Sequence, residues 1–191
     1  ASIGYQASIV ITPQQEADMD IKATLNNLLI PYTSNYAGTL LPGIREYTVT
    51  PGEKTTTISG KGKAGLKQEE NYYFFYLPVC YKGITGKSYA YYNTSRSKNL
   101  YLPASVDENY SYDIQLPENL TLCTPIQEKK IDNPIGSFKI TLTSEGSSLH
   151  IELALQIKKQ LITPAEYPAF RSLITEWTDR TRKPILFKTV Q

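Results

Sequence analysis

The chain has 191 residues, enough for a well-buried core in one domain or in two small ones. Its 20 Lys and Arg residues against 18 Asp and Glu residues leave a formal net charge of +2, which gives no basic surface suited to nucleic acid or to an anionic membrane. No apolar run approaches the roughly 20 residues that a membrane-spanning helix needs. One His and two Cys leave little material for metal binding or nucleophilic catalysis.

The first 68 residues are expected to form an N-terminal β region, either separate or part of the same unit as the rest. Residues 26–43 mix apolar residues with Pro, Asn and Gly, so we expect a long connection there. Residues 60–68 are rich in Gly and Lys and predict a flexible hairpin or linker, since the run at 60–65 lacks the spacing of a phosphate-binding loop. Short strands are predicted at 5–11, 19–25, 48–50 and 55–59.

Residues 69–191 carry the strongest signal, an alternation of apolar and polar residues. In residues 149–157 every second residue is Leu or Ile, which predicts a strand with one buried face. The same alternation recurs at 110–116 and 138–142, and residues 72–79 are apolar on both faces, as in a central strand. These runs predict a mainly β fold, an antiparallel β-sandwich of immunoglobulin-like type.

One helix is predicted at residues 164–182. The Thr-Pro-Ala-Glu run at 163–166 is typical of a capping box, with Pro at the first helical position. Because Pro168 would crowd a regular first turn, we expect that turn to be 3₁₀ or kinked and the regular helix to start nearer Pro168. The helix should end before Pro184, with a closing strand at 185–190. Its apolar stripe, predicted to pack on the sheet, consists of Tyr167, Phe170, Leu173, Ile174 and Trp177.

Catalytic residues are not indicated. Cys80 and Cys123 lie among apolar strand residues, without the helix start or imidazolium that stabilises a reactive thiolate; they are expected to be unpaired and buried, although a disulfide between them stays open. His150 falls on the polar face of its strand and is expected to be solvated. One His and two distant Cys are too few ligands for zinc. The carboxylate pairs at 69–70 and 107–108 are interpreted as solvated loop charges.

Tyrosines cluster between residues 72 and 101. Exposed aromatic rings on a sandwich can stack on sugars or contact a protein partner, whereas buried ones simply pack the core. The candidate binding surface is formed by Tyr89, Tyr91, Tyr92 and Tyr101.

The order of motifs from residue 72 to residue 190 resembles a known family. The motifs are YFFYLP at 73–78, LYLP at 100–103, YSYDIQLPEN at 110–119, the aliphatic strand at 149–157 and ITPAEY at 162–167. This region is similar to the C-terminal β domain, of unknown function, found in secreted bacterial transglutaminase-like proteins, whose catalytic core is papain-like.

The resemblance implies an accessory domain without chemistry of its own, which packs on or positions the transglutaminase-like core of the same parent chain. The core would be a cysteine peptidase or an acyl-transfer enzyme, and the location would be secreted or periplasmic. The family's catalytic Cys, His and Asp belong to that core, so no catalytic residue is assigned here, and no cofactor or metal is expected. The alternative is a free-standing carbohydrate- or protein-binding sandwich that uses its surface tyrosines.

Overall fold

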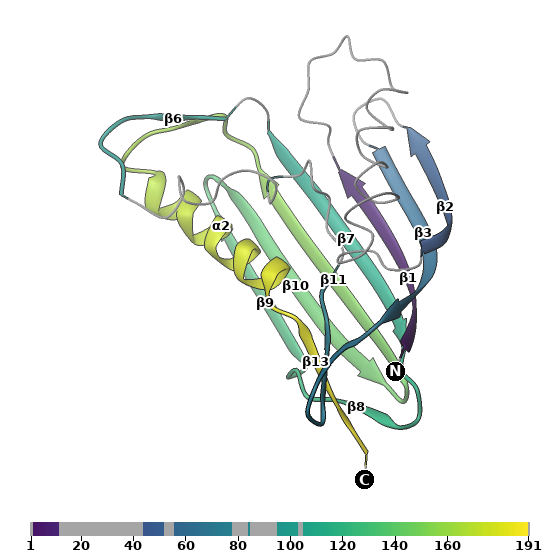
Figure 1. Ribbon diagram of the computed structural model, residues 1–191. Coiled ribbons are helices and arrows are strands. Elements are labelled where there is room, and N and C mark those ends of the chain that lie inside the picture. Colours follow the sequence, from purple (N-terminus) through teal and green to yellow (C-terminus); the bar gives the residue numbers. More distant parts are fainter. Residues whose placement is uncertain are drawn as a thin grey trace.

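The computed structural model describes residues 2–11, 44–51, 56–77, 84, 95–102 and 105–190. This part of the chain is mainly β: it forms three antiparallel sheets and one C-terminal helix, which confirms the predicted fold class (Figure 1). The described helix, α2 (Tyr167–Arg182), is not long and apolar enough to cross a membrane.

The largest sheet has seven strands in the order β2-β3-β1-β7-β11-β10-β9. Their bounds are β1 (Ser2–Ile11), β2 (Ile44–Pro51), β3 (Thr56–Gly65), β7 (Val106–Gln115), β9 (Gln127–Asn133), β10 (Gly136–Glu145) and β11 (Ser148–Ile157). Since β1 pairs with both β3 and β7, strands from both sides of residue 68 share this sheet. The division of the chain into two domains at that residue stays a prediction.

Two smaller sheets complete the fold. The four-stranded sheet has the order β4-β5-β13-β8, with β4 (Lys67–Glu69), β5 (Tyr72–Phe75), β8 (Leu120–Leu122) and β13 (Ile185–Thr189). The two-stranded sheet pairs β6 (Leu100–Tyr101) with β12 (Leu161–Ile162).

The flexible hairpin or linker predicted at residues 60–68 is wrong for residues 60–65. Residues 60–65 form the second half of β3, and they pair with β1 from Gly60 opposite Ala7 to Gly65 opposite Ser2. A strand flanked by partners satisfies its backbone groups on both sides, and that overrides the weak strand propensity of glycine. Of the strand predicted at 72–79, β5 covers only 72–75; residues 76 and 77 are not in a strand, and residues 78 and 79 lie outside the described part of the chain. Tyr72 is exposed, so β5 is not buried on both faces as predicted. The predicted strand at 19–25 and the connection at 26–43 lie outside the described residues.

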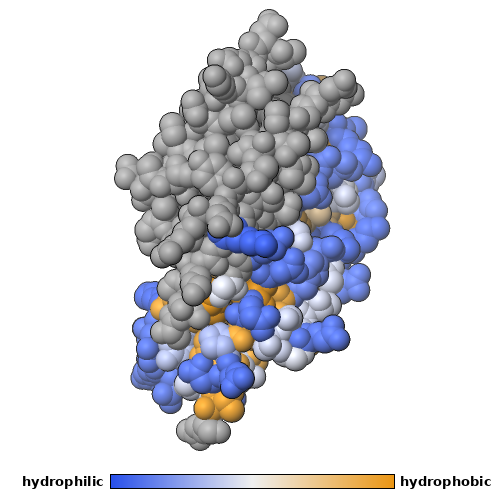
Figure 2. All heavy atoms as spheres, turned by 90° about the vertical axis from the view of Figure 1, so that its right-hand side faces the viewer, coloured by the Kyte–Doolittle hydropathy of each residue, from blue (hydrophilic) through white to orange (hydrophobic). Residues whose placement is uncertain are grey.

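The core lies on one face of the seven-stranded sheet. The inward residues of β11, from Leu149 to Ile157, are buried, while the alternate residues are partly exposed. Helix α2 lies across this covered face near β9 and β10, and its whole predicted stripe is buried (Figure 1). The face shown in Figure 2 is mostly hydrophilic over the described residues, and small apolar patches lie among the hydrophilic ones.

The helix begins three residues later than predicted. Residues 164–166 form a turn, α2 starts at Tyr167, and Pro168 is then in its first turn, where the missing N–H is not needed. This agrees with the expected irregular first turn. The helix ends at Arg182, before Pro184, and the predicted closing strand is β13.

Candidate functional site

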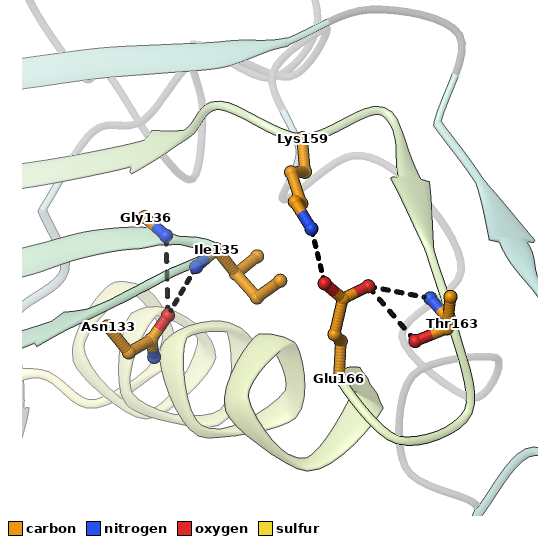
Figure 3. Close-up of polar contacts among 6 residues, drawn as sticks. All are labelled: Asn133, Ile135, Gly136, Lys159, Thr163 and Glu166. Atoms are coloured by element: carbon orange, nitrogen blue, oxygen red, sulfur yellow. Dashed lines mark hydrogen bonds and ion pairs between the residues drawn. The ribbon is translucent and has the colours of Figure 1, made fainter.

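The corner before α2 is fixed by Glu166, whose side chain folds back as the capping box predicts (Figure 3). Glu166 Oε2 accepts hydrogen bonds from the backbone N–H of Thr163 at 3.1 Å and from its hydroxyl at 3.0 Å, while Lys159 Nζ donates to Oε1. Lys159, followed by the Thr163 donors, lowers the pKa of Glu166 to about 2. The carboxylate is therefore ionised and fully engaged at this corner.

Asn133, at the turn between β9 and β10, ties the same end of the helix to the sheet. Figure 3 shows its side chain and the two N–H groups of the turn that it binds. Its Oδ1 accepts from the backbone N–H groups of Ile135 at 2.9 Å and Gly136 at 3.3 Å, and its Nδ2 donates to the Ala169 carbonyl oxygen at 3.1 Å. A Cβ at Gly136 would lie 1.9 Å from the carbonyl oxygen of Gln156, so only glycine fits. The start of α2 is thus held rigidly.

A pocket of about 460 Å³ opens beside this rigid corner, and we call it the helix-end pocket. The guanidinium carbon of Arg96 lies 5.9 Å from the centre of the Tyr167 ring, within cation–π range. The lining residues come from the 95–96 segment, from β9 and from the turn and first half of α2: Ser95, Arg96, Ile131, Pro164, Tyr167, Pro168, Arg171, Ser172, Thr175 and Glu176.

The helix-end pocket has an excess of positive charge. Within the described part of the chain, neither Arg96 nor Arg171 forms an ion pair, whereas the lining carboxylate of Glu176 pairs with Lys129 Nζ at 2.5 Å. Burial raises the pKa of the Tyr167 hydroxyl, and the nearby charges of Arg96 and Arg171 oppose that rise. Both guanidinium groups therefore lie close enough to act on the same point of the pocket.

Exposed apolar side chains lie at the same end of the molecule. Tyr101 on β6 is 69% exposed, and the residue paired opposite it, Leu161 on β12, is 51% exposed (Figure 1). Directly paired residues share a face of the sheet, so the two side chains are neighbours. Tyr89, Tyr91 and Tyr92 lie outside the described residues, and the four-tyrosine surface stays a prediction.

His150 lies on the polar, outward face of β11, as predicted, but it is part of an ion-pair chain. Its Nδ1 is 2.7 Å from Asp113 Oδ1 and its Nε2 is 3.6 Å from Glu152 Oε1, while Lys139 Nζ is 3.1 Å from Glu152 Oε2. The hydrogen bond that the His150 ring makes to the Asp113 carboxylate is the main cause that raises the pKa of His150, and Lys139 lowers the pKa of Glu152. The carboxylates beside both ring nitrogens favour the protonated form of this imidazole.

Of the two cysteines, Cys123 lies away from the helix-end pocket and Cys80 lies outside the described residues. Cys123 is free and half-buried just after β8, where its backbone N–H donates to the Leu186 carbonyl at 2.8 Å. Cys80 is outside the described part. Among the described residues, no group of three or more His, Cys, Asp or Glu side chains is placed to hold a metal ion.

Glu108 does not lie where the sequence predicts it. It is only 3% exposed, on the inward face of β7, and not a solvated loop charge. The Ile84 backbone N–H donates to its Oε1 at 2.5 Å, the Tyr110 hydroxyl donates to its Oε2 at 2.8 Å, and burial raises its pKa to about 7. Burial of Glu108 was predictable from the alternation of Val106, Tyr110 and Tyr112, because side chains two residues apart lie on the same face of a strand.

The part of the chain that contains α2 and the helix-end pocket matches a known protein family. Residues 71–187 match a family described as a domain of unknown function with a solved structure, DUF3858. The chain belongs to the DUF3858 family. The DUF3858 region contains α2, the helix-end pocket, Glu108 and His150, and it leaves out β1, β2 and β3.

The crystal structure of a "putative protease" from Parabacteroides distasonis is similar to this DUF3858 chain. The sequence identity is 30% and the TM-score 0.55, over 64% of this chain and 24% of that one. The chain thus aligns with about a quarter of the length of the Parabacteroides protein. A comparison with curated proteins gives no match.

Proposed function

We propose that this chain is an accessory β domain of a larger protein of the peptidase or acyl-transfer class, which packs on or positions a catalytic core and does no chemistry itself. The observation that carries the proposal is the coverage of the Parabacteroides match. The similar region is 24% of that protein, so about three quarters of it is other polypeptide to which this kind of domain is joined.

The identity of the core as transglutaminase-like rests on the sequence resemblance, as does a secreted or periplasmic location. The site geometry favours a supporting role. The imidazole of His150 is engaged by Asp113 and Glu152, and the rigid corner at Glu166 and Asn133 is the kind of fixed surface that a neighbouring domain can pack against.

The proposal is tested with three forms of the Parabacteroides protein: the whole protein, a form lacking the similar quarter, and a chimera with residues 71–187 of this chain in its place. We expect the deletion to lower the midpoint of thermal unfolding of the remaining core, because it removes an interdomain contact, and the chimera to recover part of that loss. Calorimetry of the three forms measures this. A deletion whose core unfolds at the same temperature as in the whole protein would contradict an accessory role.

A second candidate function, protein binding by an independent sandwich, is favoured by the exposed pair of Tyr101 and Leu161. Large apolar side chains exposed side by side are typical of contact surfaces. This function predicts an unchanged deletion midpoint in the experiment above, so the same calorimetry separates the two candidates.

A further inference from the structure

We infer that the helix-end pocket binds an acidic peptide segment, with a carboxylate between Arg96 and Arg171 and a neighbouring apolar side chain against Pro164, Pro168 and Ile131. This goes beyond the accessory role proposed above, which assigns no ligand to the helix-end pocket.

The charged groups at the helix-end pocket favour an anionic ligand. The lining carboxylate of Glu176 is paired with Lys129, and Glu166, which lies in the chain between the lining residues Pro164 and Tyr167, is bound by Lys159. The guanidinium groups of Arg96 and Arg171 have no carboxylate partner within the described residues. A planar guanidinium binds a carboxylate through two parallel hydrogen bonds, so two unpaired groups at one pocket favour an anionic ligand.

The size and the apolar wall of the pocket favour an organic anion over a small inorganic one. Its volume of about 460 Å³ lies within the range of ordinary ligand sites and far exceeds a bare inorganic anion. Pro164, Pro168 and Ile131 give it an apolar wall, which a small anion would leave uncovered. A carboxylate beside an apolar side chain, as in an acidic peptide, satisfies both the charge and the wall.

Exposed apolar side chains beside the pocket extend the surface that a bound peptide would cover. Leu161 precedes the pocket residue Pro164 by three positions, at most about 10 Å along the chain. Leu161 and Tyr101 therefore offer a second apolar contact next to the pocket. The first turn of α2 adds the positive end of the helix dipole on the same side.

The test uses the full chain and two synthetic peptides, N-acetyl-Leu-Glu-Leu-Glu-Tyr-amide and the same peptide with Gln in place of both Glu. Each is titrated into ¹⁵N-labelled protein and followed by NMR. We expect the acidic peptide to shift amides of residues 95–102 and 163–176 and to bind at least about tenfold more tightly than the Gln peptide, as expected for charge-assisted hydrogen bonds. Sodium acetate at the same concentration should produce no saturable shifts there.

Variants assign the effect to the two guanidinium groups. Arg171→Ala and Arg96→Ala should each weaken binding about tenfold, and Arg171→Lys should fall between, because lysine keeps the charge but not the paired hydrogen bonds. Arg171 is exposed and has no ion-pair partner in the described part, so its removal leaves the fold intact. The matched control is Lys188→Gln on β13, an exposed lysine outside the pocket, which should bind as the wild type does. Equal binding of the two peptides, unchanged affinity in the Arg171 and Arg96 variants, or shifts centred on His150 would each overturn the inference.

Discussion

Replacing Trp177 by Ala should lower the free energy of unfolding by about 3–5 kcal/mol, the usual cost of removing a large aromatic side chain from a packed core. Trp177 is fully buried, and its ring centre lies 5.5 Å from that of Tyr110 on β7. It therefore joins the helix to the centre of the seven-stranded sheet. A loss of this size is a large part of the roughly 5–15 kcal/mol that stabilises a domain.

Denaturant midpoints of three variants measure this effect. Arg171→Ala, on the exposed side of the same helix, is the control and should change the free energy of unfolding by no more than about 0.5 kcal/mol. Trp177→Phe should cost less than Trp177→Ala, because it keeps an aromatic ring and removes an indole N–H that has no hydrogen-bond partner in the described part of the chain. Equal midpoints for Trp177→Ala and Arg171→Ala would show that the stripe is exposed and that the helix is a docking face for another domain.

Stability should fall as the pH rises from about 5 to about 8, and Glu108 should be the main cause. Its folded-state pKa is about 7 against an ordinary value of 4.5, so between these values the folded state holds a proton that the unfolded state has lost. The contribution is present below the unfolded pKa and is lost as the pH rises through the folded pKa. The difference between the two pKa values corresponds to about 3 kcal/mol.

Glu108→Gln should remove most of this pH dependence and make the protein more stable than the wild type at pH 8. The amide oxygen can still accept from the Ile84 N–H, and the amide NH₂ can donate to the Tyr110 hydroxyl oxygen. Urea midpoints at pH 5, 6, 7 and 8 give the two profiles. Parallel profiles for wild type and variant would contradict the assignment.

Glu152 and Glu166 affect the stability in a different pH range from Glu108. Glu152 and Glu166, whose pKa values are lowered, would lose stabilisation only as the pH falls below about 4.5. His150 acts in the same direction as Glu108, because its raised pKa gives stability that is lost as the pH rises through it. His150 is partly exposed and its ion pairs are screened, so its share is smaller, and it remains in Glu108→Gln as a residual slope.

Local periodicity predicted the elements whose side chains repeat along one segment. The alternation in residues 149–157 gave β11, and the spacing from Tyr167 to Trp177 gave the buried stripe of α2. Residues 60–65 were interpreted as a linker because strand propensity is local, whereas the pairing of β3 with β1 comes from a distant segment.

Most of the candidate site was not predictable from the sequence, because its residues come together through contacts between distant segments. Glu108 is predicted as a solvated loop charge because its stretch is turn-like in sequence, although its position between Val106 and Tyr110 puts it inside. Arg96 and Arg171 are distant in sequence, and no motif connects them; only folding places both beside Tyr167. The capping contact from Glu166 to Thr163 was predictable because its partners are three residues apart.

The most direct test of the central claim, that the chain performs no chemistry itself, is a turnover assay on the chain alone. A fluorogenic peptide substrate and a glutamine donor with an amine acceptor are incubated with the protein, with and without iodoacetamide, beside an active cysteine peptidase as positive control. We expect no turnover above buffer, since Cys123 lies half-buried after β8 and His150 is paired with carboxylates. Turnover that iodoacetamide blocks, and that Cys80→Ser or Cys123→Ser abolishes, would contradict the claim.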